Sequence, residues 1–262
     1  MKKIRIIAVA NQKGGTGKTS VTHNLGTNLA RQGKKVLVVD LDPQANLTMC
    51  MGYDQPDDLS CTMAHIFKGL IDETFAFQKE EYILHAEGCD LIPSSIQLSG
   101  IEPSLANAMS RENLLKRLLS PLKDEYDYIL VDCAPSLGLL TINALAAATS
   151  ILVPVQAHYL SAKGLELLIG TVAKVKRNIN PDLDFNGILI TMYDGRLKFS
   201  KSILSELREA YGQHIPIYET MIPQSVKAVE NTAEGKSLFA YDSKCKVSLA
   251  YEAFANEVLA NG

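Results

Sequence analysis

The stretch that most constrains this chain covers residues 11–19 and reads Asn-Gln-Lys-Gly-Gly-Thr-Gly-Lys-Thr. It lies between an apolar run at 4–10 and a run at 20–31 with apolar residues at helical spacing. Glycines let backbone N–H groups turn toward an anion, because no Cβ stands in the way. A following helix adds unpaired N–H groups and the positive end of its dipole. A strand, a glycine-rich loop and a helix in this order predict a phosphate-binding loop.

Two side chains at the end of this loop have the chemistry that a nucleoside triphosphate requires. We expect Lys18 to reach the β- and γ-phosphates and the Thr19 hydroxyl to hold Mg²⁺. The ordinary loop has glycine where this chain has Gln12, and Lys13 follows, so the loop carries two lysines. Lys13 has two interpretations. It is an exposed lysine that only adds positive field, or a point charge that reaches a nucleotide across a dimer interface, as an arginine finger does.

Composition limits the classes of protein to which the chain can belong. Its 262 residues are 47% hydrophobic and 21% charged, which fits one α/β domain. The net charge of −3 means that nucleic-acid binding would need a local basic patch. No apolar run reaches about 18 residues, and the N-terminal apolar run is too short for a signal peptide. The five cysteines form no C-x-x-C pair, which favours reduced thiols in the cytoplasm over an Fe–S or zinc site.

Buried-type apolar runs alternate with helical patterns along the whole chain. This alternation predicts one α/β domain over 1–262, with a mostly parallel central sheet and helices on both faces. The segment 46–88 is expected to be a helical excursion with loops. The predicted strands are 4–10, 36–40, 89–94, 128–132, 150–155, 186–192 and 218–222, and the predicted helices are 20–31, 111–123, 137–148, 162–176, 199–211 and 244–259.

Three aspartates lie at the carboxyl ends of predicted strands, where ligands bind in open α/β sheets. Asp132 matches a carboxylate placed near bound Mg²⁺, and Asp40 is expected to support the same ion, directly or through water. Asp42 is expected to orient or activate a water for attack on the γ-phosphate. The alternative for each is structural, because aspartates also start turns and cap helices.

Five segments together resemble one known group of proteins. The chain is similar to the ParA/Soj partition ATPases of the ParA/MinD superfamily, which have a deviant Walker A loop. No helix-turn-helix extension precedes the loop, so the chain resembles the short form of this family. The resemblance implies a P-loop NTPase fold. The segments that carry it are KGGTGKT at 13–19, VDLDPQAN at 39–46, YILVDCAPSLG at 128–138, LTINA at 140–144 and ITMYDGR at 190–196.

The resemblance implies an Mg²⁺-dependent ATPase that hydrolyses ATP to ADP and phosphate. ATP would lie between two subunits of a homodimer, with Lys13 reaching across. The dimer would bind double-stranded DNA without sequence preference, on the nucleoid, until a ParB-type centromere-binding protein stimulates hydrolysis. Relatives often have Asn at the position of Ser225. The implied nucleotide contacts are Lys13, Gly14, Gly15, Thr16, Gly17, Lys18, Thr19, Ser20, Pro223 and Ser225.

The family's DNA-binding positions fall on Arg196 and Lys227 of this chain. Relatives often have Arg at the second position, and Lys lacks the forked geometry of a guanidinium. Lys198 and Lys201, together with Arg208, would widen the patch. Without the resemblance, these residues are ordinary solvated charges. Phosphate binding by such a patch would depend strongly on salt.

Other functions share this fold. A ParA-like ATPase that positions a protein cluster would keep the same ATPase and DNA-binding surface and differ only in its partner. A MinD-like membrane switch needs a basic amphipathic C-terminal helix, whereas 251–262 contains Glu252 and Glu257 and no Lys or Arg. A metal-cluster carrier of the nitrogenase iron-protein type would need paired cysteines. A phosphotransferase similar to dethiobiotin synthetase would need a second substrate pocket, which no segment suggests.

Overall fold

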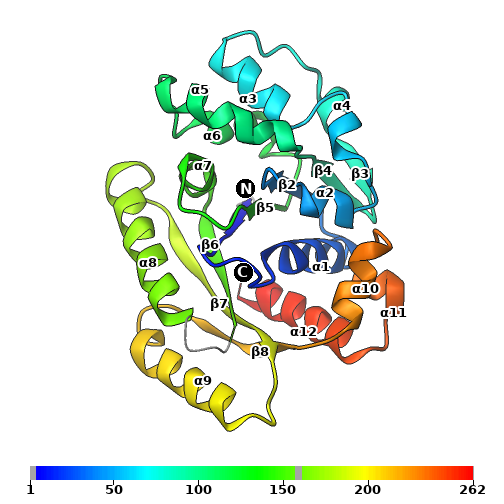
Figure 1. The fold of residues 1–262 in the computed structure, drawn as a ribbon, viewed down its shortest axis with the longest axis vertical. Helices are drawn as coiled ribbons and strands as arrows, with labels where there is room; N and C mark the ends of the chain where they lie inside the picture. The colour runs from blue at the N-terminus through cyan, green and yellow to red at the C-terminus, as the bar shows by residue number, and fades with distance from the viewer. Residues whose placement is uncertain (1–3, 157–160, 262) are drawn as a thin grey trace.

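One mixed sheet organises the molecule. In the computed structural model, which describes residues 4–156 and 161–261, eight strands follow the order β3-β4-β2-β5-β1-β6-β7-β8 (Figure 1). Every neighbouring pair is parallel except β3 and β4. The strands are β1 (Arg5–Val9), β2 (Val36–Leu41), β3 (Leu84–Ala86), β4 (Cys89–Ile92), β5 (Tyr128–Cys133), β6 (Ser150–Gln156), β7 (Asp184–Tyr193) and β8 (Ile217–Pro223).

Helices pack on both faces of this sheet, and Figure 1 shows α1 and α12 side by side on one of them. That face is covered by α1 (Lys18–Arg31), α2 (Asn46–Cys50), α10 (Lys227–Ala233), α11 (Leu238–Asp242) and α12 (Lys246–Ala260). The other face is covered by α3 (Met63–Ile71), α4 (Lys79–Tyr82), α5 (Glu102–Asn107), α6 (Leu114–Leu119), α7 (Leu139–Ala147), α8 (Ser161–Asn178) and α9 (Lys198–Tyr211).

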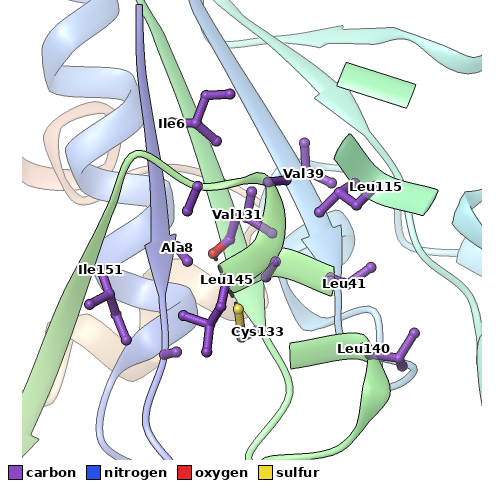
Figure 2. Packing of buried hydrophobic residues seen from close by; sticks show 14 of the residues in the cluster. Ile6, Ala8, Val39, Leu41, Leu115, Val131, Cys133, Leu140, Leu145 and Ile151 are labelled. Carbon is purple, nitrogen blue, oxygen red and sulfur yellow. Dashed lines mark hydrogen bonds between the residues drawn. The ribbon is translucent and has the colours of Figure 1, made fainter. Parts of the chain in front are cut away.

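The central strand β1 contributes to both hydrophobic cores. Ile6 and Ala8 pack into the core on one face, and Ile7 and Val9 into the core on the other. A strand buried on both faces gains from apolar side chains at every position, which explains the nearly continuous apolar runs in the sequence. Figure 2 shows the first core, with labelled side chains from β1, β2, β5, β6, α6 and α7.

The predicted α/β class and mostly parallel sheet are confirmed, and the differences lie between the strands. The helix predicted at 111–123 is α6 alone, followed by a 3₁₀ turn at Ser120–Leu122, where Pro121 lacks the N–H that a continuing helix needs. The predicted excursion at 46–88 contains α2, α3, α4 and β3. Helices α5, α10 and α11 were not predicted, because each has seven residues or fewer and shows no full helical period.

Candidate nucleotide site

The glycine-rich loop runs from the end of β1 to the start of α1 and encloses the amine of Lys18. The Lys18 side chain is buried, and its Nζ donates a hydrogen bond to the carbonyl of Lys13 at 3.1 Å. Gly15 and Gly17 have φ values of 72° and 85°, in the left-handed region that favours glycine. The loop therefore closes around the Lys18 amine.

The ends of β6 and β7 hold this loop from the side. Gln156 Nε2 donates to the carbonyl of Gly15 at 2.6 Å, and Thr191 Oγ1 donates to the carbonyl of Thr16 at 2.8 Å. Met192, beside them, has a φ of 51°, which is uncommon for a residue with a side chain. The predictions from sequence did not include these supports, although Thr191 and Met192 lie inside one of the five resembling segments.

A hollow of about 320 Å³ opens beside the loop. It is lined by eight of the predicted site residues, and Asn46, Cys50, Pro135 and Met192 complete its wall. Pro223 and Ser225 do not line it; they lie in a second hollow of about 440 Å³. The predicted residues in the first hollow are Gly14, Gly15, Thr16, Gly17, Lys18, Thr19, Ser20 and Asp42.

The predicted carboxylates meet at the ends of β2 and β5. Asp40 and Asp132 are register partners, and both side chains are fully buried. Thr19 Oγ1 donates to Asp132 Oδ2 at 2.7 Å. Burial raises the pKa of Asp40 to about 6. Burial, together with the nearby charge of Asp40, raises the pKa of Asp132 well above its ordinary range. Burial likewise lowers the pKa of the Lys18 amine, and Asp132 opposes that shift.

The side chains present fit a magnesium ion that takes some of its ligands from a bound phosphate. Within 4–156 and 161–261, no cluster of three His, Cys, Asp or Glu side chains is placed to hold a metal ion. Mg²⁺ usually takes only one or two protein ligands and completes its octahedron with water and substrate phosphates. The Thr19 hydroxyl and the Asp132 carboxylate could supply these protein ligands. The charge of Lys18 is close to Asp132.

The two principal basic residues predicted to bind DNA are each paired with a carboxylate. The Arg196 guanidinium makes two hydrogen bonds to Asp194, Nε to Oδ1 at 2.9 Å and Nη2 to Oδ2 at 2.7 Å. These bonds lower the pKa of Asp194 to about 2. Lys227 forms an ion pair with Asp242. The side chain of Arg196 is nonetheless 90% exposed, so it remains accessible to a phosphate.

Further lysines lie near these two residues. Lys198 and Lys201 are exposed on the first turn of α9, directly after the loop that carries Arg196. Lys244 and Lys246 line the second hollow together with Lys227. The predictions from sequence did not single out the last two. They lie near the start of α12, and the fold, through α10 and α11, brings them to Lys227.

Comparisons with known proteins bear on this geometry. The family model described as AAA domain matches residues 4–185. The sporulation initiation inhibitor protein Soj of Bacillus subtilis is 41% identical over 261 residues, which cover 98% of this chain and 99% of Soj. The chromosome partitioning protein ParA of Myxococcus xanthus is 38% identical over 255 residues, covering 97% and 88% of the two chains. The chain belongs to the ParA/Soj family.

A solved structure with a bound nucleotide analog has a similar fold. Cobyrinic acid a,c-diamide synthase from Mycobacterium smegmatis, with bound ATP analog and magnesium, is 35% identical. It has a TM-score of 0.84 and an alignment that covers 98% of this ParA/Soj family chain and 94% of that one. In the part of the chain that the structure describes, no helix is both long and apolar enough to cross a membrane.

Proposed function

We propose that this chain is an Mg²⁺-dependent ATPase of DNA partition whose ATP-bound homodimer binds double-stranded DNA without sequence preference. One observation carries the proposal. The part of the loop from Gly14 to Thr19 forms one wall of a hollow that Asp42 also lines, in a chain 41% identical to Soj. The protein would act in the cytoplasm, on the nucleoid. A ParB-type centromere-binding protein would stimulate hydrolysis and release it from DNA.

The nucleotide would be held by groups that are already in place. The left-handed glycines would let backbone N–H groups turn toward the phosphates, and the positive end of the α1 dipole would face them. Lys18 would exchange its bond to the Lys13 carbonyl for phosphate oxygens. Thr19 and Asp132 would hold Mg²⁺, with Asp40 behind them. When bound, the ion neutralises charge on the phosphates and orients them for in-line attack.

Asp42 is the proposed group that orients the attacking water. It lines the hollow and is 7% exposed, so its carboxylate is largely shielded from bulk solvent. Its Oδ1 accepts a hydrogen bond from the Gln44 N–H at 3.0 Å, which fixes the direction of the carboxylate. Orientation of a water by one fixed side chain is a recurring part of NTP hydrolysis.

Lys13 would complete the site of a second subunit. Its carbonyl and N–H are used within its own loop, by Lys18 and Asn11 respectively. The partly exposed ammonium of Lys13 is therefore the part of the residue available to a partner. DNA phosphates would contact Arg196 and Lys227, with the lysines around them. Because two copies of this patch act together only in the dimer, DNA affinity would depend on the nucleotide state.

Two other functions use the same site. A ParA-like ATPase that positions a protein cluster would bind ATP and DNA in the same way, and the partner that stimulates it would come from the cluster. A synthase that binds ATP is the second candidate, because the M. smegmatis protein with a TM-score of 0.84 is a cobyrinic acid a,c-diamide synthase with a bound ATP analog. A synthase of this kind would have no need for nucleotide-dependent DNA binding.

The test measures phosphate release and retention on non-specific DNA, with ATP, ADP or no nucleotide, and with Mg²⁺ or EDTA. The proposal predicts slow hydrolysis that needs Mg²⁺, and DNA retention only with ATP and Mg²⁺. Retention that is equal in all nucleotide conditions, or hydrolysis without any ATP-dependent retention, would contradict it. Addition of the ParB-type partner with DNA is expected to increase the rate of hydrolysis, whereas a cluster protein would do so in the alternative.

A further inference from the structure

Thr48, a buried residue of α2, makes three hydrogen bonds close to the end of β2. Its N–H and its Oγ1 both donate to Asp40 Oδ2, at 2.9 and 2.7 Å. The same Oγ1 accepts a hydrogen bond from the Ser94 N–H at 3.0 Å. The hydroxyl thus donates and accepts at once, and it joins the end of β2, helix α2 and the segment after β4.

Asp40 connects Thr48 to Asp42 by hydrogen bonds. The second oxygen of Asp40, Oδ1, accepts the Asp42 N–H at 3.1 Å. Asp40 is fully buried, so water does not compete for its carboxylate, which accepts hydrogen bonds from both Thr48 and Asp42. The orientation of the Asp42 carboxylate depends on the backbone of this turn, since Asp42 Oδ1 accepts a hydrogen bond from the Gln44 N–H.

The turn between Asp42 and Thr48 contains a residue in an unfavourable conformation. Ala45 has a φ of 52°, and its N–H closes the turn on the Asp42 carbonyl at 2.9 Å. The left-handed conformation is unfavourable for a residue with a Cβ, so such a turn persists only when neighbouring contacts hold it. The hydrogen bonds between Thr48 and Asp40 join the residues that follow and precede this turn, and they can therefore hold it.

Thr48 itself is separate from the nucleotide hollow. The α2 residues that line the hollow are Asn46 and Cys50, four positions apart on one side of the helix. Thr48 lies between them in sequence and faces Asp40 on the opposite side. We propose that Thr48 is a positioning residue for hydrolysis, which sets the place of Asp42 through Asp40 without touching the nucleotide. This inference rests on the proposed ATPase function.

The kinetic test compares Thr48→Val, which removes the hydroxyl at similar volume, with Thr48→Ser, which restores it. Thr48→Val should lower kcat about 10- to 100-fold, because small misplacements of a reacting group cost rates of that order. Its nucleotide Kd should stay within about twofold of the wild type, since the binding loop is unchanged. Thr48→Ser should recover most of kcat. A normal kcat in Thr48→Val, or a loss in Thr48→Ser as large as in Thr48→Val, would overturn the proposal.

The chain offers a matched control in Thr149. Its Oγ1 accepts from the Ile6 N–H and donates to the Ile6 carbonyl, both at 3.0 Å, at the opposite end of the sheet from the loop. Thr149→Val thus removes a hydroxyl that also donates and accepts, and it should leave kcat unchanged. An equal loss of kcat in Thr149→Val would reduce the effect at Thr48 to general destabilisation and refute the proposal.

Amide hydrogen exchange tests, without measuring catalysis, whether Thr48 and Asp40 hold the turn that contains Asp42. In Thr48→Val, exchange at the amides of Asp42, Gln44 and Ala45 should become faster, while exchange in α1 stays as in the wild type. Unchanged exchange at these three amides would contradict the proposal. This measurement also separates two failures. If the wild type does not hydrolyse ATP, the proposed function fails, whereas the exchange result still decides whether Thr48 holds the Asp42 turn.

Discussion

Asp40 and Asp132 face each other as register partners on adjacent parallel strands, with both carboxylates withdrawn from solvent. Burial disfavours the charged form of each; the charge of Asp40 adds to this effect at Asp132, and the charge of Asp42 adds to it at Asp40. A cation placed beside them reverses this penalty. The pair therefore lowers the free energy of unfolding of the metal-free protein near neutral pH, and it favours binding of Mg²⁺ at the end of the glycine-rich loop.

This arrangement predicts that the metal-free protein becomes more stable as the pH falls from about 7 to about 5. The pKa of Asp40 is raised to about 6 in the folded state, so the folded protein binds a proton that the unfolded chain releases. Asp40→Asn should remove this part of the pH dependence, because an amide does not titrate. Urea unfolding at the two pH values, in EDTA, measures the effect.

Exposed Asp58 provides the control for the loss of one carboxylate. Asp58→Asn should keep the pH dependence of the wild type. If Asp40→Asn retains that dependence in full, the buried carboxylate is not its source.

Lys18→Ala should weaken nucleotide binding by at least about 100-fold, because several charge-assisted hydrogen bonds to phosphate are lost. Lys18 is the buried cation of the loop, and its Nζ is the group that would reach the phosphates. Titration with a fluorescent ATP analogue measures the Kd. Lys35→Ala, at an exposed lysine outside the hollow, is the control. An unchanged ATP affinity in Lys18→Ala would remove the loop from the nucleotide site.

Asp194→Asn should tighten DNA binding about twofold to fivefold at low salt, the range expected for release of one exposed ion pair. The substitution frees the Arg196 guanidinium, which Asp194 now holds with two hydrogen bonds. Asp184→Asn is the control, because Asp184 is an exposed carboxylate paired with Lys176 on another part of the surface. A gel-shift titration across salt concentrations measures both. Equal gains in the two variants would mean that only net charge matters.

Gly235→Ala should destabilise the protein more than Gly33→Ala. Both glycines have a positive φ, 61° and 77°, so alanine is strained at either position. A Cβ at Gly235 would lie 2.9 Å from the Cα of Gly52, whereas the space around Gly33 is open. The added overlap should cost about 1–3 kcal/mol more at Gly235, as overpacking does elsewhere. Equal unfolding free energies of the two variants would show that the turn after α10 does not pack on α2 in this way.

The fold and the loop could be predicted from sequence because their signals are local. The glycines, Lys18 and Thr19 are contiguous, and the apolar strands have a clear pattern. The supports of the loop are not local, since Thr191 is 175 positions from Thr16 and no spacing rule connects them. The short helices α10 and α11, which bring Lys244 and Lys246 to Lys227, have too few residues to show a period. Tertiary packing alone decides these features.

DNA retention by two variants tests the central claim most directly. Asp42→Ala should form an ATP-bound dimer that cannot turn over and stays on DNA, and this retention should be absent with ADP. Arg196→Glu should form the ATP-dependent dimer, as measured by sedimentation, and lose DNA retention at low salt. Retention of Arg196→Glu equal to that of the wild type, or nucleotide-independent retention of Asp42→Ala, would contradict a switch in which ATP-driven dimerisation controls DNA binding.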